Sequence, residues 1–233
     1  FLSRPATRLS AAAVVKTGDE ASWTATFRLN GAILDDTLAG RLHEGIKSMM
    51  SENDISGRAN LSGEINHIRE EGIEFSTWDI AVDCMGLDVA SGWVFSNTRG
   101  KLDFDGTASE EQTAFTLSGD LESISWEGRD AGHTVFHLSH TGEHLLLRSL
   151  DTEIAGGSLS ARARMAAAGD AAWAFSMRFE DLALKRVLEE VLNYRKEGLY
   201  GKTSGKIEAV CLTGRKSDLY GTCLLYTSPS PRD

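Results

Sequence analysis

The feature that most constrains this chain is a regular alternation of apolar and polar residues, repeated in run after run. Between Trp23 and Asn30, for example, every second residue is apolar and its neighbours are polar. Successive side chains of a β-strand point to opposite faces, so this pattern is typical of a strand with one buried and one wet face. Similar runs recur from Ile55 to Cys211, and turn-forming residues separate them about every 8–12 residues. The sequence therefore predicts a mostly β fold of about 9–12 antiparallel strands joined by short connections.

Two stretches depart from this alternation and have the spacing of amphipathic helices. The first is predicted from Thr37 to Met50, and the second from Leu182 to Lys196 after an N-cap at Asp181. Each has a single apolar stripe, and the first lacks the Lys and Arg density of a membrane-surface helix. We expect both helices to pack against a sheet. Their stripes are Leu38, Leu42, Ile46 and Met49, and Leu184, Val187, Leu188, Val191 and Leu192.

The charge balance and the cysteines narrow the class of protein further. The chain has 24 Lys and Arg residues against 34 Asp and Glu residues, a formal net charge of −10. This charge disfavours nucleic acid or an anionic membrane surface as the main partner. No apolar run approaches the ~20 residues that a membrane-spanning helix needs. Cys84 and Cys211 are too few for a disulfide framework, and we expect both to be buried and unpaired in strands.

The C-terminal residues have a different character. Residues 223–233, CLLYTSPSPRD, match the translation of a transposase-type sequencing adapter. The alternative is a natural tail rich in Ser and Pro. We exclude this segment from the fold and expect it to make no fixed contacts. Because the chain also begins at Phe1 rather than at a methionine, we expect a fragment of a longer protein whose natural part is residues 1–222.

Two motifs that suggest chemistry do not fit the surrounding pattern. Gly201-Lys202-Thr203 is similar to the end of a phosphate-binding loop, but Lys196 stands where that loop needs its first glycine. The predicted order around it is helix, turn, strand, whereas a phosphate-binding loop needs strand, turn, helix.

The best candidates for metal ligands are four histidines with strand-like neighbours. On a strand, residues four positions apart are separated by ~13 Å, too far for one tetrahedral ion. The sequence therefore predicts surface histidines around a turn, with no metal and no cofactor. The many carboxylates are expected on solvated strand faces, and no nucleophile elbow, zinc-protease or calcium-loop motif is present, so we expect no enzymatic activity. The histidines are His133, His137, His140 and His144.

Several segments together resemble the C-terminal part of AsmA-like proteins of the bacterial envelope. The resemblance covers most of Trp23 to Gly221 and depends on strand pattern and glycine placement. The segments that carry it are Leu34-Asp35-Asp36-Thr37-Leu38, Ile154-Ala155-Gly156-Gly157-Ser158-Leu159, Phe179-Glu180-Asp181-Leu182-Ala183-Leu184 and Gly201-Lys202-Thr203-Ser204-Gly205.

This resemblance implies a periplasmic domain of a diderm bacterium, built as a long, curved antiparallel sheet that forms a groove. It implies an inner-membrane anchor outside this sequence and a role in moving phospholipids toward the outer membrane and in outer-membrane integrity. The implied partners are phospholipid acyl chains, with the two membranes contacted by other parts of the protein.

If the sheet forms such a groove, its lining is the apolar face of the most regular strands. An acyl chain on that face would be shielded from water while its headgroup stayed wet at the open edge. The same alternation also fits a closed protein core, and a non-catalytic structural or adhesive module of the cell envelope is the alternative function. An enzyme acting on polysaccharide would require carboxylates that converge in a cleft. The candidate lipid-binding residues are Trp23, Phe27, Leu29, Leu102, Phe104, Phe115, Leu117, Trp173, Phe175, Met177 and Phe179.

Overall fold

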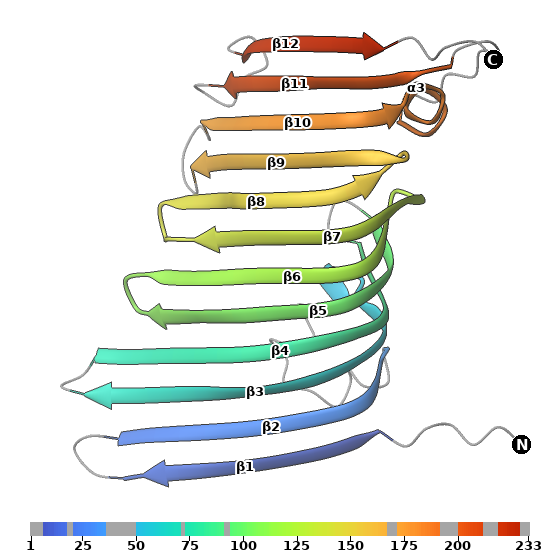
Figure 1. The fold of residues 1–233 in the computed structure, drawn as a ribbon. Coiled ribbons are helices and arrows are strands. Elements are labelled where there is room, and N and C mark those ends of the chain that lie inside the picture. The colour runs from blue at the N-terminus through green and yellow to red at the C-terminus, as the bar shows by residue number, and fades with distance from the viewer. Residues whose placement is uncertain are drawn as a thin grey trace, which may run out of the picture. The chain divides into compact units, whose positions relative to one another are not determined.

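The fold is described here from a computed structural model, which covers residues 7–17, 21–35, 50–70, 73–90, 94–166, 172–191, 200–211 and 219–228. The chain divides into two compact units, Phe1–Gly128 and Arg129–Asp233, referred to as unit 1 and unit 2. Both units are mostly β, with antiparallel strands in chain order (Figure 1). Twelve strands lie in the described residues, within the range predicted from the turn spacing.

Unit 1 contains six of these strands. They are β1 (Arg8–Lys16), β2 (Ala21–Leu34), β3 (Ser56–Glu70), β4 (Ile73–Ala90), β5 (Val94–Ser109) and β6 (Thr113–Trp126). Strands β2 to β5 curl over at one end, on the right in Figure 1. The pairing register shifts at this end, between Leu29 and Ala32, between Gly57 and Ala59, and between Met85 and Leu87. Such bulges bend a strand and increase its twist, which explains the curvature predicted for the sheet.

The buried residues of unit 1 gather at this curled end. Ala32 and Ala59 are fully buried, and Cys84 and Leu87 are 3% and 7% exposed. Met50, which begins the described residues after the gap at 36–49, is 6% exposed and packs into the same cluster. The small side chains of Ala32, Ala59 and Cys84 allow this close approach. The predicted helix from Thr37 to Met50 otherwise lies outside the described residues.

Unit 2 contains the remaining described strands. They are β7 (Arg129–His140), β8 (His144–Ile154), β9 (Gly157–Ala166), β10 (Trp173–Ala183), β11 (Lys202–Cys211) and β12 (Leu219–Ser228). A short helical segment, α3 (Leu184–Arg186), follows β10 and continues as a π-helical turn, η1 (Val187–Val191). Gly201-Lys202-Thr203 leads into β11, so a strand follows this segment, as predicted.

The predicted start of the second helix is wrong. Asp181 does not cap a helix, because β10 continues through Leu182 and Ala183, which pair with Thr203 and Lys202 of β11. Asp181 lies at a β-bulge with a φ of 57°, where its backbone N–H donates to Ser204 Oγ at 3.0 Å. Lys202 Nζ donates to Asp181 Oδ2 at 3.2 Å. The cross-strand partners therefore occupy the groups that would cap a helix, and α3 begins only at Leu184, without a side-chain cap.

The expectation that residues 223–233 make no fixed contacts is also wrong for their backbone as far as Ser228. β12 pairs antiparallel with β11 over its whole length, from Leu219 opposite Cys211 to Ser228 opposite Lys202. The physical reason is that the outer edge of β11 offers a row of unpaired N–H and C=O groups, and the segment LYGTCLLYTS is rich in residues that favour strands. Pairing of this kind depends on backbone groups and is independent of where the sequence originated.

Candidate functional site

The strand register of unit 1 places most of its large apolar side chains on one face of the sheet. In β2 this face carries Trp23, Phe27 and Leu29, which lie opposite His67, Gly63 and Leu61 of β3. Following the pairing through β4, β5 and β6 extends the same face across the unit. We call it the unit 1 face, and it consists of Trp23, Ala25, Phe27, Leu29, Leu61, Gly63, Ile65, His67, Ser76, Trp78, Ile80, Val82, Leu102, Phe104, Gly106, Phe115 and Leu117.

All seven candidate residues of this unit therefore share one face, but they differ in surroundings. Leu29 and Leu102 pack against the buried cluster at the curled end. Phe27, Phe104, Phe115 and Leu117 are only half-buried, and Trp23 is 37% exposed. Strands of this length in a closed two-layer core would have alternate residues fully buried along most of their span. Full burial here is confined to the curled end, and the rest of the face is covered incompletely by the described residues.

An aromatic cluster occupies the middle of the unit 1 face. The Trp78 ring lies 5.7 Å from Phe104, and the Phe104 ring lies 5.5 Å from Phe115 in an edge-to-face arrangement. Trp78 covers Gly106, where a Cβ atom would come within 2.3 Å of its ring. Trp78 Nε1 is buried and has no hydrogen-bond partner among the described residues. Sequence reasoning missed Trp78, although it alternates in phase with Ile80, Val82 and Cys84.

Unit 2 has an equivalent apolar face. Trp173, Phe175 and Met177 of β10 lie opposite Met165, Ala163 and Ala161 of β9 and opposite Cys211, Ala209 and Ile207 of β11. The same face continues on β8 with Leu145, Leu147 and Leu150. We call the apolar face formed by these residues the unit 2 face. Phe179 is on this side as well, but it is 7% exposed and belongs to the closed end near Leu182.

Small side chains form a strip along the middle of the unit 2 face. Ala161 and Ala163 of β9 are half-exposed. On one side they adjoin Leu147 and Leu150, and on the other side Phe175 and Met177. The strands that carry these larger residues are separated by two strand spacings, or ~9.6 Å. We call Ala161 and Ala163 the β9 strip, a row of small side chains between two rows of larger ones.

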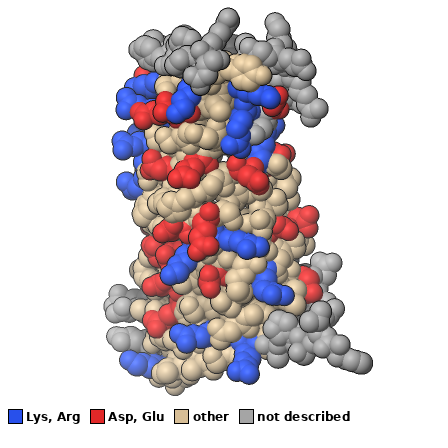
Figure 2. Space-filling view, turned by 45° about the vertical axis from the view of Figure 1, so that its right-hand side comes forward, with Lys and Arg blue, Asp and Glu red and all other residues tan. Residues whose placement is uncertain are grey.

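In both units the opposite face of the strands is polar. In unit 1 the carboxylates of Glu64, Asp79 and Asp105 occupy directly opposed positions on β3, β4 and β5. In unit 2 the corresponding face includes Arg162 and Arg178. Figure 2 shows acidic and basic side chains interspersed over one side of the molecule. In each unit, apolar residues thus lie on one face of the strands and charged residues on the other, as the alternation predicts.

The remaining predicted chemical groups have simple structural explanations. His140 and His144 flank the turn between β7 and β8, as predicted, but they are half-buried. The predicted surface position holds for His133 and His137, which are exposed on β7. No group of three His, Cys, Asp or Glu side chains in the described ranges is arranged to hold a metal ion.

Neither Cys84 nor Cys211 forms a disulfide among the described residues, and both are buried in strands, as predicted. Burial, with a smaller effect of the neighbouring Asp83 carboxylate, raises the pKa of the Cys84 thiol to about 11. The thiol is therefore protonated at neutral pH and is a poor nucleophile.

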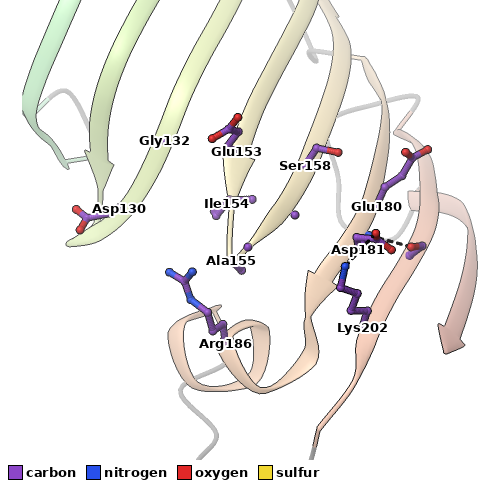
Figure 3. A pocket seen from close by; sticks show the side chains of 13 residues that line it. Asp130, Gly132, Glu153, Ile154, Ala155, Ser158, Glu180, Asp181, Arg186 and Lys202 are labelled. Carbon is purple, nitrogen blue, oxygen red and sulfur yellow. Dashed lines mark hydrogen bonds and ion pairs between the residues drawn. The ribbon is translucent and has the colours of Figure 1, made fainter. Parts of the chain in front are cut away.

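A polar cavity of about 930 Å³ lies at the end of unit 2 where β10 meets α3 (Figure 3). Carboxylates of Asp130, Glu153 and Glu180 border it together with the Arg186 guanidinium and the Lys202–Asp181 ion pair. Glu153 and Glu180 both lie opposite Ser158 and so belong to the polar side of the sheet. The cavity is therefore separate from the unit 2 face, and its mixed charges distinguish it from an apolar ligand site.

Comparisons with known proteins give no match to this chain, whether with family models, curated proteins or solved structures. Among the described residues, no helix has the length and apolar character needed to cross a membrane.

Proposed function

We propose that this chain is part of a periplasmic, AsmA-like envelope protein that binds phospholipid acyl chains on its apolar sheet faces and takes part in their transport to the outer membrane. The observation that carries the proposal is the incomplete covering of the unit 1 and unit 2 faces by the described residues. Large half-exposed apolar surfaces on soluble domains usually mark a binding site. The segment resemblance to AsmA-like proteins supplies the class of ligand and the cellular location.

The energetics favour an acyl chain as the ligand. Each methylene that leaves water contributes about 0.8 kcal/mol. The candidate residues on these faces are aromatic or aliphatic, so a hydrocarbon chain needs no hydrogen-bond partner and leaves no polar group unsatisfied. A uniform apolar lining also lacks a deep specific pocket, so a bound chain has similar interactions at successive positions along the face. That property suits movement of lipid along a surface.

The β9 strip gives the proposal its most specific geometry. A chain lying over Ala161 and Ala163 has larger side chains on both sides, Leu147 and Leu150 on β8 and Phe175 and Met177 on β10. It therefore gains contact with three strands at once. Such an arrangement buries more of a cylindrical ligand than a flat surface of equal composition.

The test places charge on the unit 2 face. In the double variant Phe175→Glu and Met177→Glu, two carboxylates stand where the acyl chain is proposed to lie. Both positions are half-exposed, so the carboxylates reach water and the fold should survive. We expect crosslinking of a photoactivatable phospholipid to unit 2 to fall at least about ten-fold, since one buried unpaired charge costs several kcal/mol.

The matched control places the same charges on the other side of the same strand, as Ser176→Glu and Arg178→Glu. This variant should crosslink lipid as well as the parent does. Circular dichroism melting of both variants separates loss of binding from loss of fold. Unfolding of the Phe175 and Met177 variant alone would identify the face as a closed core and favour the structural module. A folded variant with undiminished crosslinking would exclude unit 2 as the lipid site.

A further inference from the structure

The unit 1 face changes from apolar to charged at the end opposite the buried cluster. Ile65 and Trp78 lie opposite each other in the last wholly apolar row of β3 and β4. The next row outward is His67 opposite Ser76, and the one beyond is Arg69 opposite Glu74. Side chains on one face of a strand are ~6.7 Å apart, so the change is complete within ~13 Å. A phospholipid has the same order of polarity along its length, from apolar acyl chain to charged headgroup.

Side-chain contacts connect these outer residues into one polar rim. Trp23 stacks on His67 with ring centroids 5.6 Å apart and an angle of 24° between the rings. His67 Nδ1 lies 2.9 Å from Ser76 Oγ. Arg69 Nε and Glu74 Oε1 are 3.9 Å apart, and their side chains are 62% and 50% exposed. We call Trp23, His67, Arg69, Glu74 and Ser76 the unit 1 rim.

The contact between Arg69 and Glu74 is long, and both side chains are accessible to a ligand. At 3.9 Å the Arg69–Glu74 contact is longer than a good charge-assisted hydrogen bond, which is about 2.7–2.9 Å. Exposed pairs of this kind contribute little to stability. A ligand that carries both charges can therefore engage the two side chains at little cost to the fold.

We propose that the unit 1 rim binds the zwitterionic headgroup of a phospholipid whose acyl chains lie on the unit 1 face. The Arg69 guanidinium binds the phosphate, with which its planar fork of N–H donors is complementary. The Glu74 carboxylate accepts hydrogen bonds from the ammonium group. His67 and Ser76 lie one row inward, where they provide hydrogen bonds to the ester groups, and the Trp23 indole occupies the boundary between apolar and wet regions.

This inference rests on the proposed function, because the rim has a role as a headgroup site only if the face takes acyl chains. It adds selectivity to that function. A headgroup with only negative charge gains the contact with Arg69 but is repelled by Glu74. The rim therefore favours phosphoethanolamine heads over phosphoglycerol heads.

The experiment measures binding of monomeric short-chain ligands to the whole chain by titration calorimetry. The probes are dihexanoyl phosphatidylethanolamine, dihexanoyl phosphatidylglycerol and octyl glucoside, which has an alkyl chain but no charge. Glu74→Gln should weaken binding of the ethanolamine lipid about three-fold, in line with an exposed ion pair, without weakening binding of the glycerol lipid. Arg69→Gln should weaken binding of both phospholipids. Octyl glucoside should bind all three proteins equally.

The control variant is Glu64→Gln, which removes a carboxylate from the polar face of β3 and should change none of the affinities. If octyl glucoside binds but neither rim variant alters phospholipid affinity, the rim proposal is overturned and the proposed function stands. If octyl glucoside does not bind the parent, the apolar faces take no alkyl chain, and both proposals fail together.

Discussion

At the scale of single residues, the contact between Trp78 and Gly106 shows how the unit 1 face is filled. Gly106 has no side chain, and the indole of Trp78 lies over it. The glycine is opposite Phe115 on its other side, so two large aromatic residues share the space of one missing side chain.

We expect Gly106→Val to destabilise the protein by about 1–3 kcal/mol, the usual cost of overpacking. A Cβ atom at this position would lie 2.3 Å from the Trp78 ring and 2.8 Å from the Ala114 carbonyl oxygen, so either the ring or the backbone must move. Urea denaturation measures the effect. Ala108→Val, on the same face of the same strand, is the control and should change stability by less than about 0.5 kcal/mol. Equal stability of the two variants would show that the Trp78 ring relocates freely.

The alternation in the sequence was sufficient to predict which face of each strand is apolar. It was not sufficient to predict how far each side chain on that face is buried. Alternation alone places Phe27 on the apolar side of β2, Phe104 on the apolar side of β5, and both Phe175 and Phe179 on the apolar side of β10. Whether each side chain is exposed depends on where the sheet bends. The bend arises from β-bulges, and the alternation of apolar and polar residues does not show where these lie. This is why Phe179 is buried while Phe175 is not. Trp78 was overlooked because Ile73 and Phe75, earlier in the same strand, are out of phase with it and lie exposed.

At the scale of elements, the strands follow the sequence pattern closely and the helix start does not. Asp181 has the residue type of an N-cap and precedes an apolar stripe, which is a sound local signal. However, Leu182 pairs with Thr203 of β11, so β10 extends beyond Asp181. Local sequence patterns do not show which distant residue pairs with the end of a strand. The end of a strand is therefore harder to predict from the sequence than its centre.

The prediction at the scale of elements concerns the β9 strip. Ala161→Phe with Ala163→Phe places large rings between the larger side chains of β8 and β10 and should reduce crosslinking of a photoactivatable phospholipid to unit 2 at least about five-fold. Both alanines are half-exposed, so the added rings project from the sheet and the melting temperature should stay within a few degrees of the parent.

The matched control for this pair is Ser160→Phe with Arg162→Phe, which adds the same rings to the opposite face of β9. It should leave the crosslinking yield unchanged. Undiminished crosslinking of the alanine variant would place the acyl chain elsewhere on the unit 2 face.

At the scale of the whole molecule, the edge of β11 that β12 covers is informative about the C-terminal segment. Residues 223–228 of β12 belong to the segment predicted to be encoded by a sequencing adapter, yet their backbone pairs with β11. If this pairing is adventitious, deletion of residues 223–233 should preserve the β-rich circular dichroism spectrum. It should also increase self-association, because the freed edge of β11 can pair with another chain.

Sedimentation velocity across a concentration series measures the self-association of the shortened chain. Loss of the folded spectrum on deletion would instead show that the segment is an integral part of the sheet. Sequencing of independently prepared DNA tests the origin of the segment without reference to its structure.

The sequential order of strands has a consequence for how such a chain is made. Within each unit every strand pairs with the strand that precedes it, so each new hairpin finds its partner as soon as it is synthesised. Loop closure between such neighbours is entropically inexpensive compared with pairing of distant segments. Folding can therefore advance vectorially from the N-terminus, one hairpin at a time, during translation. By the same logic, duplication or loss of a whole hairpin in evolution would lengthen or shorten the sheet without disturbing the register of the strands that remain.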